Sequence, residues 1–273
     1  MKPPAFEYSA AASVEEAVAL LADGTEAKVL AGGQSLVPLL NMRLARPALL
    51  VDVNCVPDLD RIEIDGAVEI GALVRQADAL ASRELARAVP LLHAALRHVG
   101  YVATRSRGTV GGSIAHADPA AELPAVLLAL DGSATVSSAT GERAITAGEL
   151  FLGPFTTSLA ADELLTSLTV PRCGGRAFGF AELARRDGDF ALAGACVLFE
   201  PARVVIFGVA GRPMRAAEAE AALEAGGSSE EAAALATRDL DPVSDVHADG
   251  AYRRRVAAVL VRRAIEQAEA QRG

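Results

Sequence analysis

The chain has 273 residues, of which 51% are hydrophobic and 22% charged, and its formal net charge at pH 7 is −9. This length allows one large domain or two ordinary ones, and the composition is typical of a soluble globular protein. The acidic charge and the complete absence of Trp argue against nucleic acid as a partner, because such proteins use a basic footprint and aromatic stacking surfaces.

The cysteines exclude two classes of site. Cys55, Cys173 and Cys196 are odd in number and widely spaced, which indicates neither a disulfide framework nor a CxxC metal site. Because an iron–sulfur cluster takes about four protein ligands, any such cluster must come from a partner. The N-terminus lacks an apolar signal region, and no apolar run approaches the roughly 20 residues of a membrane-spanning helix. A cytoplasmic location without a membrane-spanning segment is therefore expected.

The first predicted elements form a strand, a turn and a helix. Residues 13–16 have the spacing of a capping box and predict a short helix over 17–21. A buried strand over 28–31 ends at Ala31-Gly32-Gly33-Gln34-Ser35, which we call the first glycine segment. Its serine is expected to cap a helix over 36–44.

Strands and helices alternate from there to a predicted domain boundary. A helix-rich stretch over 74–99 precedes Thr109-Val110-Gly111-Gly112-Ser113, the second glycine segment. Asp118 and Pro119 are expected to be the N-cap and first residue of a helix over 120–130. The strands expected in this region are 49–53, 68–72, 133–137 and 163–170.

Turn residues at 171–175 interrupt the apolar pattern and predict a boundary between two domains, 1–172 and 173–273. The first domain is expected to have two lobes, approximately 1–55 and 56–172. The second domain is expected to contain strands over 177–183, 190–199 and 204–210, a helix over 216–225 and a final helix from about 250.

The two glycine segments are the best indication of function. A Gly-Gly pair lets the main chain approach a ligand closely and aim successive N–H groups into one concavity, which suits a pyrophosphate. Neither segment fits GxGxxG or GxxxxGK[ST], so the Rossmann and P-loop explanations fail on spacing. A tight turn alone explains either segment taken singly, whereas the two together indicate a dinucleotide.

Both glycine segments, with Asn41-Met42-Arg43-Leu44 and residues 114–120, resemble the FAD-binding medium subunit of molybdenum-containing hydroxylases. That family includes aerobic carbon monoxide dehydrogenase and xanthine dehydrogenase. Further similar segments at 185–191 and 252–263 extend the resemblance over nearly the whole chain. It implies an α+β fold, with a two-lobed FAD-binding domain of the vanillyl-alcohol-oxidase/PCMH type and a smaller α+β C-terminal domain of antiparallel strands plus helices.

The resemblance also implies which residues contact FAD. Glu122 stands where the family often has an acid facing the adenosine, although a solvated helix position explains it equally well. Phe190 occupies a position that in relatives is often Tyr or an aliphatic residue beside the isoalloxazine ring, and it lacks the Tyr hydroxyl. No catalytic side chain and no metal ligand is expected. The residues expected around the pyrophosphate and ribityl groups are Ala31, Gly32, Gly33, Gln34, Ser35, Thr109, Val110, Gly111, Gly112 and Ser113.

The function implied is that of an FAD-binding, electron-transfer subunit of an oxidoreductase. A large molybdenum subunit would oxidise the substrate, a small [2Fe–2S] subunit would relay electrons, and FAD here would pass them to an external acceptor, in a dimer of heterotrimers. Two alternatives remain open: a stand-alone FAD-dependent oxidase or dehydrogenase, and a non-enzymatic nucleotide-binding module. The sequence identifies neither the substrate nor the acceptor, which could be quinone, NAD or oxygen.

Overall fold

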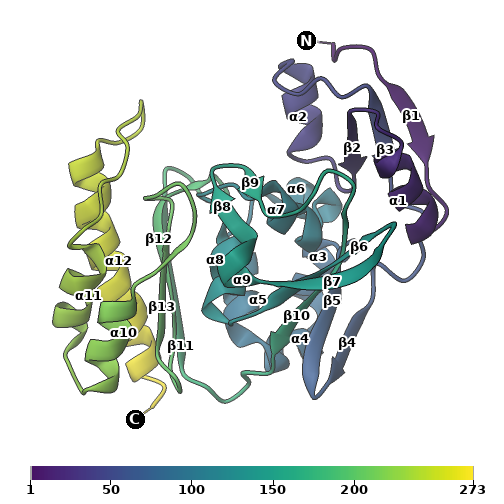
Figure 1. Ribbon diagram of the computed structural model, residues 1–273. Helices are drawn as coiled ribbons and strands as arrows, with labels where there is room; N and C mark the ends of the chain where they lie inside the picture. Colours follow the sequence, from purple (N-terminus) through teal and green to yellow (C-terminus); the bar gives the residue numbers. More distant parts are fainter. Residues whose placement is uncertain (1, 273) are drawn as a thin grey trace.

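The computed structural model describes residues 2–272, in which three larger sheets and one two-stranded sheet are found (Figure 1). The first lobe has a parallel sheet in the order β1-β3-β2, and the apolar cluster around it includes Val18, Leu49 and Val51 together with Leu73 and Leu164 of the second lobe. Its elements are β1 (Glu7–Ala10), α1 (Val14–Ala22), β2 (Ala27–Leu30), α2 (Leu36–Asn41) and β3 (Leu49–Asp52).

The second lobe has an antiparallel sheet in the order β4-β5-β10-β6-β7, with most of its helices packed beside it (Figure 1). Its strands are β4 (Ile62–Asp65), β5 (Ala67–Gly71), β6 (Ser133–Ser138), β7 (Gly141–Thr146) and β10 (Leu164–Pro171), with a small β8 (Phe151–Gly153) and β9 (Thr156–Thr157) hairpin. Its helices are α3 (Gln76–Ala81), α4 (Arg83–Ala88), α5 (Pro90–Leu96), α6 (Val102–Arg107), α7 (Val110–His116), α8 (Glu122–Ala129) and α9 (Ala147–Leu150).

The C-terminal part is an antiparallel sheet with helices on its outer face. Its elements are β11 (Phe178–Ala184), β12 (Ala191–Leu198), β13 (Arg203–Phe207), β14 (Met214–Arg215), α10 (Ala217–Glu224), α11 (Ser229–Thr237) and α12 (Gly250–Glu269). Helix α12 covers β11 and β12 on one face, while α5 and α8 of the second lobe cover the other (Figure 1). Every residue of β12 is consequently buried, which explains its almost continuous apolar sequence.

The second lobe and the C-terminal sheet share one apolar core. Phe180, Leu198 and Phe207 from the sheet belong to the same buried cluster as Leu92 and Leu123 from the second lobe. Because interiors are packed as densely as crystals, a shared core holds these two parts in one orientation.

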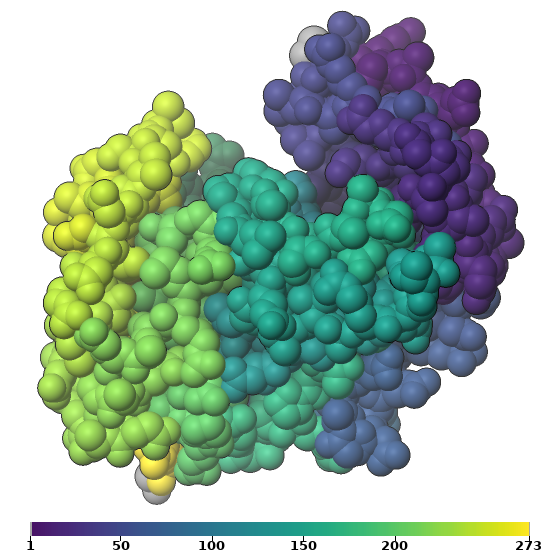
Figure 2. Space-filling model, in the orientation of Figure 1, coloured from purple at the N-terminus to yellow at the C-terminus, as the bar shows by residue number. Residues whose placement is uncertain are grey.

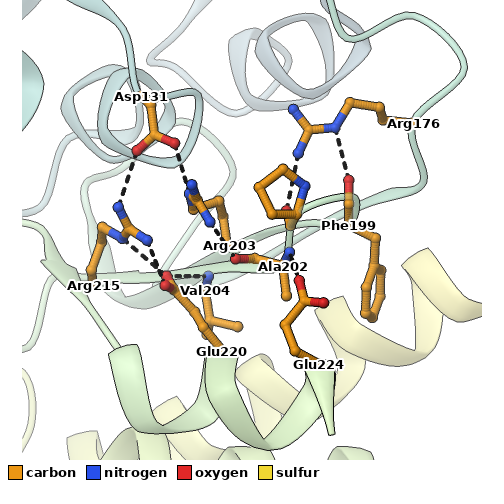
Figure 3. A network of polar contacts seen from close by, with 10 residues as sticks. Asp131, Arg176, Phe199, Ala202, Arg203, Val204, Arg215, Glu220 and Glu224 are labelled. Atoms are coloured by element: carbon orange, nitrogen blue, oxygen red, sulfur yellow. Dashed lines mark hydrogen bonds and ion pairs between the residues drawn. The ribbon is translucent and has the colours of Figure 1, made fainter. Parts of the chain in front are cut away.

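A polar network reinforces this junction, as Figure 3 shows. The Asp131 carboxylate, just after α8, accepts from Arg203 Nε at 2.7 Å and from Arg215 Nη1 at 3.1 Å. Arg215 also donates to Glu220, and a Glu220 carboxylate oxygen accepts from the Val204 N–H at 3.0 Å. One carboxylate of the second lobe thus joins two strands of the C-terminal sheet.

We expect Asp131→Asn to lower the free energy of unfolding by about 1 kcal/mol, because it removes the charge from two partly exposed ion pairs. Asparagine tolerates the positive φ of 49° at this position, so backbone strain does not enter. Asp58→Asn is the matched control, since Asp58 also has a positive φ and forms an exposed ion pair with Arg61. Urea unfolding of the two variants measures the difference, and equal losses would contradict a role for the network.

The expected α+β class is confirmed, and so is the capping box. The Ser13 hydroxyl accepts from the Glu16 N–H, while the Glu16 carboxylate reaches back to the Ala12 N–H at 2.8 Å. The prediction for Asp118 is wrong: α8 begins at Glu122, and Asp118 Oδ1 instead accepts from the Ala120 N–H in a turn before it. None of the helices within residues 2–272 is both long and apolar enough to cross a membrane.

The bounds predicted for the helix after the first glycine segment were also wrong. The helix expected over 36–44 ends at Asn41, and Ser35 makes no side-chain capping bond. The stretch over 74–99 is helix-rich, as predicted. It is divided into three helices, because the Ser82 hydroxyl accepts from the Leu85 N–H at the start of α4 and Pro90 begins α5.

Candidate functional site

A cavity of about 400 Å³ lies between the first lobe and the end of α6. Leu30 and Asp52, the last residues of the parallel strands β2 and β3, form part of its wall, so the cavity opens at the carboxyl edge of that sheet. Figure 2 shows the first lobe projecting from the body with a notch beside it. The lining residues are Leu30, Ala31, Gly32, Gly33, Gln34, Val37, Pro38, Asp52, Asn54 and Arg107.

Four residues of the first glycine segment, Ala31 to Gln34, line this cavity, and Ser35 follows them outside its lining. Within residues 2–272, the N–H groups of residues 32–35 have no hydrogen-bond acceptor in the protein. Gly33 has a φ of +73°, a conformation that glycine adopts without strain, and its carbonyl accepts from the Val37 N–H at 3.0 Å. These donors precede α2, so their arrangement suits an anionic ligand.

The first glycine segment lies close to the residues directly before the second one. A Cβ atom on Gly32 would be 2.3 Å from the Arg107 carbonyl oxygen and 2.9 Å from the Gly108 Cα. Only glycine therefore permits this approach between the first lobe and the residues directly before the second segment.

The second segment differs from the expected cradle of free N–H groups. Thr109 is the N-cap of α7, and its hydroxyl accepts from the Gly112 N–H at 3.0 Å. The Val110, Gly111 and Ser113 N–H groups donate to the carbonyls of Val74, Ala72 and Thr109. A Cβ on Gly111 would be 2.6 Å from the Ala72 Cα, and one on Gly112 would be 2.6 Å from the Thr109 hydroxyl. Packing and capping thus account for both glycines, and the role of residues 109–113 toward FAD stays a prediction.

Three polar residues of the cavity wall were missed by sequence reasoning: Asp52, Asn54 and Arg107. The Asp52 carboxylate accepts from the Tyr8 hydroxyl at 2.6 Å and from the Asn54 N–H at 2.9 Å. Burial raises the pKa of Asp52, but these hydrogen bonds and the Arg107 charge outweigh it and lower the pKa below its usual value. Arg107 adds a cation to the wall. The only sequence signals were the position of Asp52 at a predicted strand end and of Arg107 just before the second segment.

Glu122 and Phe190 lie outside the residues that line the cavity. Glu122 is buried at the start of α8, so its interpretation as a solvated helix position is wrong. Burial and the nearby Glu182 carboxylate raise the pKa of Glu122 to about 8. Phe190 is 59% exposed and follows a loop that contacts the second lobe through the hydrogen bond from the Tyr101 hydroxyl to Asp189. The FAD contacts expected of both residues stay predictions.

The raised pKa of Glu122 predicts a dependence of stability on pH. The folded state holds a proton that the unfolded chain releases near pH 4.5, so stability falls as the pH rises toward about 8. Glu122→Gln removes this titration. As the pH rises from 6 to 8, we expect the free energy of unfolding of the variant to increase by about 2 kcal/mol relative to that of the parent chain. Denaturant unfolding at both pH values measures it, with the exposed Glu63→Gln as control. Parallel profiles for parent and Glu122→Gln would contradict the prediction.

Two family models match consecutive parts of the chain. The FAD binding domain in molybdopterin dehydrogenase matches residues 4–173. The CO dehydrogenase flavoprotein C-terminal domain matches residues 178–268.

Individual relatives match over almost their full length. The alpha subunit of the 6-hydroxypseudooxynicotine dehydrogenase complex of Paenarthrobacter nicotinovorans is 44% identical over 98% of this chain and 96% of its own. Among solved structures, carbon monoxide dehydrogenase from Hydrogenophaga pseudoflava, which lacks the Mo-pyranopterin moiety of its molybdenum cofactor, is similar with a TM-score of 0.94 and 36% identity, covering 99% of each chain. Quinoline 2-oxidoreductase from Pseudomonas putida 86 matches with the same TM-score, identity and coverage.

Proposed function

The chain belongs to the family of FAD-binding medium subunits of molybdenum-containing hydroxylases, and we propose that it transfers electrons from a [2Fe–2S] partner subunit to an external acceptor. The resemblance to this family and FAD as the cofactor are confirmed. The observation that carries the placement of FAD is the row of N–H groups over residues 32–35 that have no acceptor within residues 2–272, of which Gly32, Gly33 and Gln34 line the cavity.

The residues of the cavity fit a dinucleotide. The N–H groups of Gly33, Gln34 and Ser35 would bind the diphosphate, and the Arg107 guanidinium would offset its charge. The Asp52 carboxylate is a hydrogen-bond acceptor suited to hydroxyl groups rather than to phosphate. Bound FAD supplies the redox chemistry, and the chain's part is to hold the flavin and tune it through hydrogen bonds and charge.

The partners belong to the same proposal. A small iron–sulfur subunit and a large molybdenum subunit would assemble with this chain as a dimer of heterotrimers, and the substrate pocket would lie on the large subunit. The relative from P. nicotinovorans is a subunit of a complex, and the similar carbon monoxide dehydrogenase from H. pseudoflava is an enzyme with a molybdenum cofactor, which supports this assignment. The division into domains 1–172 and 173–273 is supported by the position of the two matched ranges.

Native co-purification tests this function. We expect the chain to carry flavin and to travel with two further polypeptides, one containing iron and sulfide and one containing molybdenum. Substrate added anaerobically to the complex should bleach the flavin, whereas the isolated chain with FAD should stay oxidised. Turnover of a small substrate by the isolated chain would instead identify a stand-alone oxidase, and binding of ADP without retention of any flavin would identify a nucleotide-binding module.

A further inference from the structure

A chain of hydrogen bonds crosses from the first lobe to the second beside the cavity. Asn54 donates from Nδ2 to the Ala31 carbonyl oxygen at 2.9 Å and accepts at Oδ1 from Arg75 Nη2 at 2.7 Å. Arg75 donates from Nη1 to the Arg107 carbonyl oxygen at 2.6 Å. The side chains of Asn54 and Arg75 thus connect the carbonyl that precedes Gly32 to the carbonyl that precedes Gly108.

Both ends of this connection are held in place. Asn54 donates to Asp52 Oδ1 twice, from its side-chain Nδ2 at 2.6 Å and from its main-chain N–H at 2.9 Å. These bonds fix Asn54 at the end of β3. On the other side, the Gln76 N–H donates to the Gly108 carbonyl and the Val110 N–H to the Val74 carbonyl, both at 2.9 Å. The main chain on either side of Arg75 is therefore hydrogen-bonded to Val110 in the second glycine segment and to Gly108 just before it.

The residue types suit a bridge between lobes. Asn carries a donor and an acceptor on one short side chain, so it can bond a carbonyl and a guanidinium together. Arg places two donors in a rigid fork, whereas a Lys ammonium is a single point on a flexible stem. We propose that Asn54 and Arg75 form an interlobe clamp, two positioning residues that set the spacing of the glycine segments around the FAD diphosphate.

The clamp matters because the apolar cluster of the first lobe is separate from that shared by the second lobe and the C-terminal sheet, and it reaches the second lobe through Leu59, Leu73 and Leu164. These apolar contacts do not involve residues 32–35 or Arg107, so a small rotation between the lobes would move the first glycine segment relative to Arg107. Misplacement by about 1 Å is enough to weaken a preorganised site. This inference rests on the proposed placement of the diphosphate in the cavity.

A double-mutant cycle on the full chain tests the clamp. Affinities for FAD and for ADP, which has the diphosphate without the flavin ring, are measured by calorimetric titration of the flavin-free protein. We expect Asn54→Ala and Arg75→Ala each to weaken both ligands about tenfold, as loss of one charge-assisted hydrogen bond implies. The double variant should be about as weak as either single one, because the shared bond is lost once. Arg83→Ala, on the exposed end of α4, is the control.

Arg75→Lys separates the clamp from simple electrostatics. It keeps the charge but not the fork, so we expect it to bind as weakly as Arg75→Ala, and recovery of affinity in Arg75→Lys would overturn the clamp. The Arg75→Lys variant also provides a test of the clamp if an alanine variant fails to fold. Additive losses in the double variant, or loss of FAD with ADP binding intact, would overturn the clamp as well.

A comparison with Gly33→Val distinguishes failure of the clamp from failure of the proposed site. If Asn54→Ala and Arg75→Ala bind both ligands normally while Gly33→Val does not, the clamp is wrong and the FAD placement stands. If Gly33→Val also leaves both affinities unchanged, the placement of the diphosphate is itself wrong.

Discussion

The Gly33→Val variant is expected to fold and to be purified without flavin. A Cβ at this position would be 3.2 Å from Val37 Cγ2 and 3.3 Å from Leu30 Cδ1, so the valine side chain would crowd residues that line the cavity. We expect FAD affinity to fall about 100-fold, as loss of two hydrogen bonds to an anion implies. Titration with FAD measures the affinity, and thermal unfolding of the flavin-free protein measures the cost to the fold.

The control for Gly33→Val is Gly24→Val, in the same lobe. Gly24 has a φ of +84°, and a Cβ there would have no neighbour within 4 Å. Both substitutions force a β-branched residue into a left-handed conformation, which costs about 1–2 kcal/mol, but only Gly33 lines the cavity. Equal FAD affinities in the two variants would contradict the role of Gly33 in binding.

Gly32→Ala is expected to damage both flavin binding and stability. Its Cβ would be 2.3 Å from the Arg107 carbonyl oxygen, which belongs to the backbone and cannot rotate away. The lobes would have to separate, and overpacking of this kind costs about 1–3 kcal/mol. Urea unfolding together with FAD titration should therefore show a loss of both stability and FAD affinity.

Gly148→Ala is the control for Gly32→Ala, because a Cβ on Gly148 in α9 would meet nothing within 4 Å. We expect this variant to match the parent chain in FAD affinity and to be at least as stable. A Gly32→Ala variant that behaved like it would show that the approach of the two lobes at Gly32 is not required.

Local patterns predicted most of the buried elements of the fold. The apolar runs of β3 and β12 and the capping box of α1 are each contained in a short stretch of sequence. Strands β4 and β7 were missed because they are exposed at alternate or nearly all positions, so they carry no apolar run. Their strand conformation follows from pairing with β5 and β6, which local sequence does not reveal.

The candidate site was predictable only where main-chain conformation determines it. The first glycine segment was found because a tight, unobstructed main chain requires glycine. The partnership of Asn54 with Arg75 depends on the approach of two lobes, and no spacing along the chain indicates it. The Gly-Gly pair of the second segment was interpreted only as a binding feature, whereas the close packing of Gly111 against Ala72 also requires glycine.

The most direct test of the account is a crystal structure of this chain with FAD. We predict that the diphosphate oxygens lie within hydrogen-bonding distance of the N–H groups of residues 33–35, between the two glycine segments and beside Arg107. A diphosphate bound elsewhere, with the N–H groups of the first segment facing solvent, would contradict the account.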